Sequence, residues 1–178
     1  MIDDTVHPPD HETRIVDADH LALKLWLRLL TCTNLIDGTI RRSLRQSFDC
    51  TLPRFDLLAQ LERAPQGLKM SELSRRLMVT GGNITGLADQ LEAEGLLERE
   101  PVAGDRRATL LKLTDAGRER FAGMAADHET WVADMFASLA RDEQMQLLQL
   151  LARLKKGLAA RAAGTANAVA DITTGTVV

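Results

Sequence analysis

The stretch that decides the fold is residues 70–96, MSELSRRLMVTGGNITGLADQLEAEGL. Apolar residues recur there at three- and four-residue spacing, which predicts two helices, over about residues 70–77 and 80–94, joined by a tight turn. Thr80 suits the N-cap of the second helix, because its hydroxyl can accept a bond from a free backbone amide. The Gly95-Leu96 pair is typical of a glycine stop followed by an apolar contact.

Two short extended runs follow this pair of helices. Leu97–Glu100 and Thr109–Leu113 are separated by Pro101 and by the charged segment 104–107, GDRR, which predicts a β-hairpin with a charged tip. Helix, turn, helix and two-stranded hairpin, in this order, make a winged helix-turn-helix. Such a unit places its second helix in the major groove of DNA.

The flanking sequence is helical, because its apolar residues also step by three or four. The expected helices cover about residues 17–46, 53–63, 115–138 and 141–162. Residues 1–16 are expected to be an arm or disordered, and the small, polar residues 163–178 a disordered tail. Aromatic residues make up only 3% of the chain, so the core must be built from aliphatic side chains that suit helices. The predicted fold class is mainly α with a small β-hairpin wing.

Charge and hydropathy limit the classes of protein. The net charge of −3 is a sum over the whole chain. It does not exclude DNA binding, because only a local basic face of the protein has to contact the phosphates. Residues 1–19 are polar and acidic and show no signal peptide. The most apolar run, Leu21–Ile36, is interrupted by Lys24, Arg28 and Asn34 and predicts an amphipathic helix, not a membrane span. We expect a cytoplasmic protein with no membrane partner.

The entrance of the second helix of the pair carries the strongest functional signal. Gly81 and Gly82 each cost a helix up to about 1 kcal/mol against alanine, but they would let backbone amides approach a phosphate closely. Asn83 and Thr85 can then reach base edges, Asn being suited to adenine. The alternative is that the two glycines form a loop and the helix starts at Asn83.

Four arginines surround this entrance. Arg106 and Arg107 at the hairpin tip could enter a narrow minor groove, where the potential is most negative. Arg75 and Arg76 on the preceding helix are candidate phosphate contacts, and Thr80 at the helix entrance is a further candidate DNA-binding residue. The alternative for the arginines is an ordinary solvated charge.

These segments together resemble the MarR (multiple antibiotic resistance regulator) family. The resemblance rests on residues 73–77 (LSRRL), 83–96 (NITGLADQLEAEGL), 104–107 (GDRR) and 113–117 (LTDAG), and it extends over roughly residues 20–158. It implies a homodimer that binds a pseudo-palindromic DNA operator, usually as a repressor, and that releases DNA on binding a small, often aromatic, acid. Gly86, where many members carry arginine, and Met78, where glycine is frequent, depart from the family pattern.

The apolar stripe on the last helix is too long to be left exposed to solvent, and it therefore predicts an obligate dimer. Its members are Leu147, Leu148, Leu151, Leu154 and Leu158. The expected organisation is an arm, an N-terminal dimerisation helix, a DNA-binding lobe, C-terminal dimerisation helices and a tail, over residues 1–16, 17–50, 51–113, 114–162 and 163–178.

The resemblance also implies an effector pocket between the dimer helices and the DNA-binding lobe. The candidate lining residues are Trp26, Arg28, Arg54, Phe55 and Trp131. An arginine in a mostly apolar cleft suits an aromatic carboxylate or its thioester. Arg54 is the preferred partner of the carboxylate, because Pro53 begins the helix beside it and anions favour helix N-termini. The alternative is that the tryptophans belong to the dimer core and the arginines are solvated.

No motif of an enzyme, a cofactor site or a metal site is found. The four histidines, His7, His11, His20 and His128, are expected to be ordinary surface residues, although a metal-sensing site at the last two is the alternative. Cys32 falls at an apolar helix position, which favours an inert core thiol. Two further hypotheses are a repressor that senses thiol oxidation at Cys32 and a winged-helix module that binds proteins instead of DNA.

Overall fold

The computed structural model describes residues 20–77, 81–102 and 105–174, and for residue 102 and residues 105–108 and 163–174 only the backbone. The chain divides into two compact units, Met1–Val132 and Ala133–Val178, which are described separately. The predicted N-terminal arm, the turn at Met78-Val79, the Thr80 cap and Gly104 lie outside the described residues.

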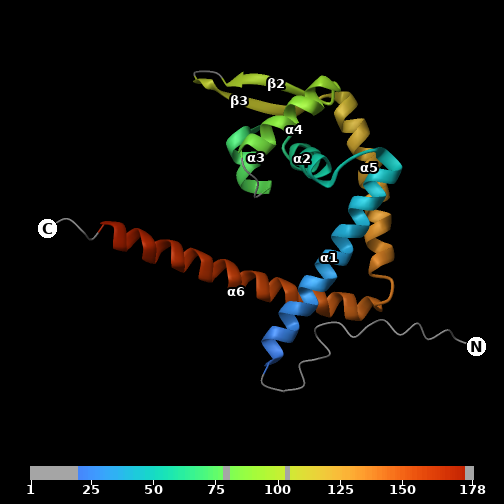
Figure 1. Ribbon diagram of the computed structural model, residues 1–178, viewed down its shortest axis with the longest axis vertical. Helices are drawn as coiled ribbons and strands as arrows, with labels where there is room; N and C mark the ends of the chain where they lie inside the picture. The colour runs from blue at the N-terminus through green and yellow to red at the C-terminus, as the bar shows by residue number, and fades with distance from the viewer. Residues whose placement is uncertain (1–19, 78–80, 103–104, 175–178) are drawn as a thin grey trace, which may run out of the picture. The chain divides into compact units, whose positions relative to one another are not determined.

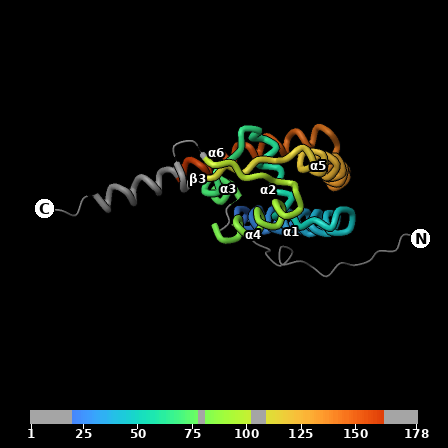
Figure 2. The backbone as a smooth tube through the Cα atoms, turned by 90° about the horizontal axis from the view of Figure 1, so that it is seen from above, coloured from blue at the N-terminus to red at the C-terminus, as the bar shows by residue number. Residues whose placement is uncertain are grey.

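The first unit holds a winged helix. Its elements in chain order are α1 (Leu21–Phe48), α2 (Leu52–Glu62), β1 (Leu68–Lys69), α3 (Met70–Leu77), α4 (Gly81–Ala93), β2 (Leu97–Val102), β3 (Asp105–Leu113) and most of α5 (Asp115–Met135). The chain can be followed through these elements in Figures 1 and 2, and Figure 1 shows β2 and β3 as a long hairpin beside α3 and α4. The second unit consists of the end of α5 and α6 (Arg141–Thr174). The predicted fold class is confirmed.

The core of the first unit is aliphatic, as the shortage of aromatic residues predicts. Phe55, Leu58 and Leu61 of α2 are buried, as expected from their spacing. The side chains that are buried to 1% exposure or less are Leu44, Leu57, Leu58, Leu61, Leu73, Ile84, Ala88, Leu91, Leu111 and Met124. They come from α1, α2, α3, α4, β3 and α5, so the core joins α2, α3 and α4 to the sheet and to the helices α1 and α5.

The sheet has one strand more than predicted. Its order is β1-β3-β2 with both pairings antiparallel, and Leu68 of β1 lies opposite Leu111 of β3. A two-residue strand is too short to show an alternating pattern, which is why the sequence does not reveal it. Gly67 precedes it with φ +85°, and a Cβ there would lie 2.8 Å from Lys112 Cγ and 2.9 Å from Leu111 O. Glycine is therefore required where β1 meets β3.

The end of α4 is a Schellman motif, as the Gly95-Leu96 pair predicts. Gly95 has φ +72°, its amide donates to Glu92 O at 2.9 Å, and the Leu96 amide donates to Leu91 O at 2.9 Å. Thr114 continues this junction by donating its hydroxyl to Gly95 O at 2.7 Å. Gly117 packs so closely that a Cβ on it would lie 2.0 Å from Leu96 O. The LTDAG segment therefore joins the start of α5 to the end of α4.

Two helix boundaries differ from the prediction. The helix after the turn begins at Gly81, so the alternative in which both glycines form a loop and the helix starts at Asn83 is wrong. The last helix runs to Thr174 instead of ending near Ala162, and residues 175–178 lie outside the described residues. Ala163, Ala166, Ala168 and Ala170 follow the predicted end, and alanine is the strongest helix former.

Much apolar surface of the single chain is uncovered. On α1 the exposed large side chains are Leu21, Leu23, Leu25, Trp26, Leu30 and Leu35, and on α6 they are Met145, Leu148, Leu150, Leu151, Leu154 and Leu158. In the described part of the chain, none of the helices is both long and apolar enough to cross a membrane. Soluble monomers rarely expose apolar stripes of this length.

Candidate functional site

The N-terminal half of α4 presents small and polar residues to solvent. Gly81, Gly82, Asn83 and Thr85 are all exposed, whereas Ile84 between them is fully buried. Ile84 therefore fixes this turn of helix onto the core and leaves its neighbours facing outward. A Cβ added at Gly81 or Gly82 would meet nothing within 4 Å. Packing within the described chain does not require glycine at either position.

One face of this helix is hollowed. Gly82 and Gly86, one turn apart, line a groove of about 350 Å³ together with Pro53, Asn83, Leu87 and Gln90. Thr85 is not in the groove, and its hydroxyl donates to Gly81 O at 3.0 Å. Its oxygen can still accept a hydrogen bond, which suits an amino group on a base edge.

The two arginines of α3 differ in their partners. Both are exposed, but Arg76 pairs with Glu72 at 2.5 Å on the same helix. Arg75 forms no ion pair with any residue that the structure describes. An incoming phosphate would meet Arg75 directly, and it would have to compete with Glu72 for Arg76.

The hairpin is tied to α4 through Arg99 of β2. Its guanidinium pairs with Asp89 at 2.6 Å and with Glu92 at 2.8 Å, both on α4. Arg106 and Arg107 lie in β3, and their side chains are outside the described residues. Sequence reasoning missed Arg99, although two acidic residues three positions apart on one helix were a usable signal.

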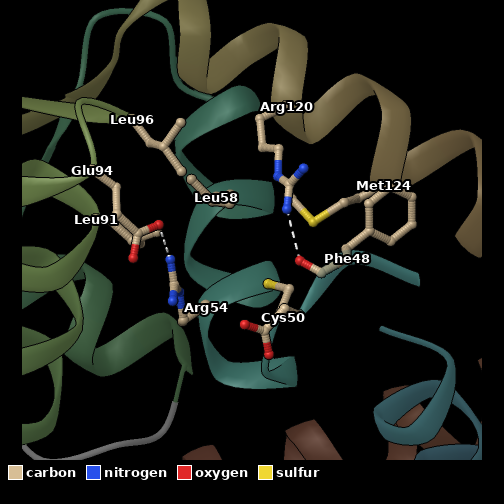
Figure 3. Close-up of a pocket in the computed structure, with 10 residues that line it drawn as sticks. Phe48, Cys50, Arg54, Leu58, Leu91, Glu94, Leu96, Arg120 and Met124 are labelled. Carbon is tan, nitrogen blue, oxygen red and sulfur yellow. Dashed lines mark hydrogen bonds and ion pairs between the residues drawn. The ribbon is translucent and has the colours of Figure 1, made fainter. Parts of the chain in front are cut away.

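A second feature of the first unit is a cavity of about 220 Å³. It is lined by Phe48, Asp49, Cys50, Arg54, Leu58, Leu91, Glu94, Leu96, Arg120 and Met124. Figure 3 shows Arg54 from α2 reaching Glu94, while Arg120 reaches in from α5 on the other side. The two cations therefore face one small space from different elements.

The charged groups of this cavity are only partly paired. Arg54 forms an ion pair with Glu94, and its side chain is 18% exposed. Its Nε is buried and has no hydrogen-bond partner among the residues described. Arg120 donates to Phe48 O at 2.7 Å and lies 5.6 Å from the centre of the Phe48 ring. Such a cation over an aromatic face is weakly attractive.

Cys50 contributes a neutral thiol to the same cavity. Burial raises the pKa of the Cys50 thiol, although Arg54 and Arg120 partly oppose this effect. The thiol therefore stays protonated at neutral pH, and it adds no negative charge beside the two arginines. A protonated, buried thiol is also a poor nucleophile.

The structure does not bring the five candidate effector residues together within the chain. Arg54 lines the cavity, and Phe55 is core, 5.5 Å from the Phe121 ring and 4.9 Å from the His128 ring. Trp131 lies 6.3 Å from Phe48. Trp26 and Arg28 are exposed and lie 22 residues or fewer before Phe48 on α1, up to about 33 Å along the helix axis.

The remaining sequence candidates, Cys32, His20 and His128, line neither the groove on α4 nor the cavity beside Arg54. Cys32 is exposed, so the expectation of a core thiol is wrong for the single chain. His20 is exposed and His128 is half-buried. Among the described residues, no group of three or more His, Cys, Asp or Glu side chains is placed to hold a metal ion.

Asp56 is a perturbed carboxyl on α2. Burial raises the pKa of Asp56, and the negative charge of Asp37 raises it further, while Arg41 and His128 partly offset the increase. The unprotonated form of this carboxyl is therefore held at a cost in the folded protein.

Comparison with known proteins supports the interpretation of the first unit. Residues 48–108 match the MarR family. The chain is 36% identical over 116 residues to the HTH-type transcriptional regulator YkoM of Bacillus subtilis (strain 168), covering 65% of this chain and 73% of that one.

Two further proteins also resemble this chain in sequence or structure. The chain is 34% identical over 106 residues to the HTH-type transcriptional regulator PecS of Dickeya dadantii (strain 3937), covering 58% of this chain and 64% of PecS. The match therefore spans a little under two thirds of the length of PecS. A crystal structure of a MarR family transcriptional regulator from Silicibacter pomeroyi superposes with a TM-score of 0.66 at 30% identity, covering 80% of this chain and 98% of that chain.

Proposed function

Because the chain belongs to the MarR family of winged helix-turn-helix transcriptional regulators, we propose that it binds operator DNA through the N-terminal half of α4. The observation that carries the proposal is the pair Gly81 and Gly82 inside a helix, with open space around both. A helix is weakened by about 1 kcal/mol for each such glycine. Close approach of a DNA phosphate to the backbone amides would explain why glycine stands at both positions despite this cost.

Selection from a random duplex library, followed by gel-shift titration at fixed salt, tests this proposal. We expect a selected site with two related half-sites about one helical turn apart, because a symmetric dimer presents two copies of α4. Binding of all sequences with equal affinity would contradict operator recognition. Failure to bind any DNA would favour the protein-interaction module instead.

We propose that the active form is a homodimer held by the exposed apolar residues of α1 and α6. Leu148, Leu154 and Leu158 are between 46% and 61% exposed in the single chain, which is costly in water. Light scattering should give twice the chain mass of 19.6 kDa. A stable monomer at micromolar concentration would contradict this proposal.

We propose further that the protein is a repressor, released from DNA by a small acid of the aromatic carboxylate class. Arg54 and Arg120, which line the cavity together with the carboxylates Asp49 and Glu94, are the groups that could bind an anionic ligand. A tenfold loss of DNA affinity needs only about 1.4 kcal/mol of differential ligand binding, which a charge-assisted hydrogen bond can supply. A reporter placed behind the selected site should rise when the gene is deleted; a fall would indicate an activator.

A second candidate trigger is oxidation of Cys32, and its exposure in the single chain favours it. Peroxide should then weaken DNA binding by the parent protein and leave a Cys32→Ser variant unchanged. Cys50 is not expected to take part, because it is buried and protonated. An equal response of the two proteins would remove the thiol trigger.

A further inference from the structure

We propose that α4 selects A·T base pairs: the amides of Asn83 and Gln90 bind adenine, and the groove over Gly82 and Gly86 takes the methyl group of thymine. The inference deepens the proposed function and rests on it, because it names the base pairs that the same helix would select. The side chains that α4 carries, and those that it lacks, both point to this pair.

The helix α4 carries no side chain that suits guanine. The described helix, Gly81–Ala93, contains neither arginine nor lysine, the residues that most often bind the two acceptors of guanine. Carboxylates suit the amino group of cytosine, but Asp89 and Glu92 already pair with Arg99 of β2 at 2.6 Å and 2.8 Å. Thr85 does not decide between the pairs, because its oxygen can accept from the amino group of adenine or of cytosine.

Two uncharged amides of α4 are available to a ligand. Asn83 and Gln90 are both exposed, and both line the groove. A carboxamide binds adenine through two hydrogen bonds, donating to N7 and accepting from the N6 amino group. The two residues are seven positions apart, about 10 Å along the helix axis, so they would contact different base pairs.

The groove beside these amides is uncharged and partly apolar. None of the six described residues that line it carries a charge, and Pro53 and Leu87 supply apolar surface. Gly82 and Gly86 lie one turn apart, and a Cβ on either would meet nothing within 4 Å, so glycine keeps the groove open. Among the bases of the major groove, thymine presents an apolar group, its C5 methyl, which suits such a surface.

An A·T pair offers both features on its major-groove edge. Adenine presents N7 and the N6 amino group, and thymine presents the methyl group. Asn83 and the two glycines line the same groove, so one pair or two neighbouring pairs can meet both. A G·C pair in the same place would offer two acceptors to an amide that itself brings an acceptor, and no methyl group to the groove.

Gel-shift titration at fixed salt, with the duplex selected from the random library, tests the role of the amides. Each base pair of one half-site is exchanged in turn between A·T and G·C. At one A·T pair the exchange should weaken the parent about tenfold to a hundredfold and leave Asn83→Ala almost unaffected. Gln90→Ala should lose discrimination at a different A·T pair. Asn34→Ala, which removes an exposed amide from α1, should respond as the parent does.

Replacement of thymine by uracil removes only the methyl group and tests the groove with the parent protein unaltered. Uracil at the thymine that meets the groove should weaken binding about fourfold, as expected for the loss of one buried methyl group. In Gly86→Ser a hydroxyl enters the groove, so thymine should lose this advantage over uracil. Gly123→Ser makes the same change in open space on α5 and should keep the preference for thymine.

The proposal is overturned if Asn83→Ala loses discrimination at a G·C pair, or if it discriminates as the parent does at every pair. It is also overturned if the parent binds uracil as well as thymine throughout the half-site, a result that needs no variant to fold. All these outcomes leave the proposed function intact, because the parent still selects a site. Failure to select any duplex would instead contradict operator recognition itself.

Discussion

The C-terminal end of α4 is tied to two other elements, whereas a side chain added at the first residues of its N-terminal end would meet nothing within 4 Å. At the tied end, Glu94 pairs with Arg54 of α2, and Asp89 and Glu92 pair with Arg99 of β2. At the open end lie Gly81 and Gly82. One helix thus forms ion pairs with two neighbouring elements at its C-terminal end and exposes small residues at its N-terminal end.

This difference shows how a helix that is proposed to bind DNA can be fixed in the fold and still expose the residues that would contact DNA. The ion pairs add contacts at the tied end, and buried Ile84 fixes the first turns of α4 to the core, so the exposed residues of the open end need no contacts of their own within the chain. Glycine at the open end lowers helix stability, and the Schellman motif and core residues such as Leu91 at the other end compensate. Substitutions at the two ends should therefore separate folding from DNA binding.

The largest effect is expected from Gly117→Ala, at the tied end. The added Cβ would lie 2.0 Å from Leu96 O, so α5 or the Gly95 turn must move. We expect a loss of about 3 kcal/mol in the free energy of unfolding, in the upper part of the range for overpacked sites. Urea denaturation followed by circular dichroism measures it. Gly123→Ala, also on α5 but in open space, is the matched control and should be neutral or stabilising. Equal stability of the two variants would show that the junction is not tight.

Gly82→Leu tests the open end. We expect normal or slightly raised stability, because leucine favours helix, together with a loss of DNA affinity of about hundredfold or more, equivalent to about 2.7 kcal/mol. The physical reason is a bulky side chain held between the helix and a phosphate. Gly123→Leu makes the same change on α5, away from α4, and should bind DNA like the parent. A Gly82→Leu variant that binds normally would show that the open end does not meet DNA.

The local features of the fold could be predicted from sequence because they depend on neighbouring residues. The period of Phe55, Leu58 and Leu61 indicates the buried face of α2, and Gly95 followed by Leu96 indicates the end of α4. Each signal lies within a few positions of its effect. The family resemblance likewise rests on motifs that are short and contiguous.

The contacts that tie α4 could not be predicted, because they join residues distant in sequence. Arg54 and Glu94 are 40 positions apart, and only the packing of α2 against α4 brings them together. The sequence singled out Arg54 as an anion partner but grouped it with Trp26, which lies far along α1. The carboxylate that occupies Arg54 in the structure comes from the chain itself, and no pattern in the sequence indicates it.

The hairpin variant Arg106→Ala tests whether the N-terminal end of α4 binds DNA alone or together with the hairpin. Arg106→Ala should weaken DNA binding by about 1–3 kcal/mol per half-site, because we propose that this arginine, the second residue of β3, contacts DNA. Gel-shift titration at fixed salt against the selected site gives the change. Arg118→Ala removes an arginine that pairs with Asp115 on α5 and serves as a control for the loss of charge. If Arg106→Ala binds as the parent does, α4 acts without help from the hairpin.

The smallest effects are expected at α3, where the two adjacent arginines differ only in their partners. Arg75→Ala should lower the slope of log affinity against log salt by about one, because one phosphate contact is lost. Arg76→Ala should lower it by less, since in the parent Arg76 must first leave Glu72, 2.5 Å away. Glu72→Gln then provides the decisive comparison: it frees Arg76, so DNA binding should strengthen and the salt slope should rise towards one extra contact. If Glu72→Gln instead leaves both quantities unchanged while Arg76→Ala equals Arg75→Ala, the ion pair has no bearing on DNA binding and α3 meets the backbone with both arginines alike.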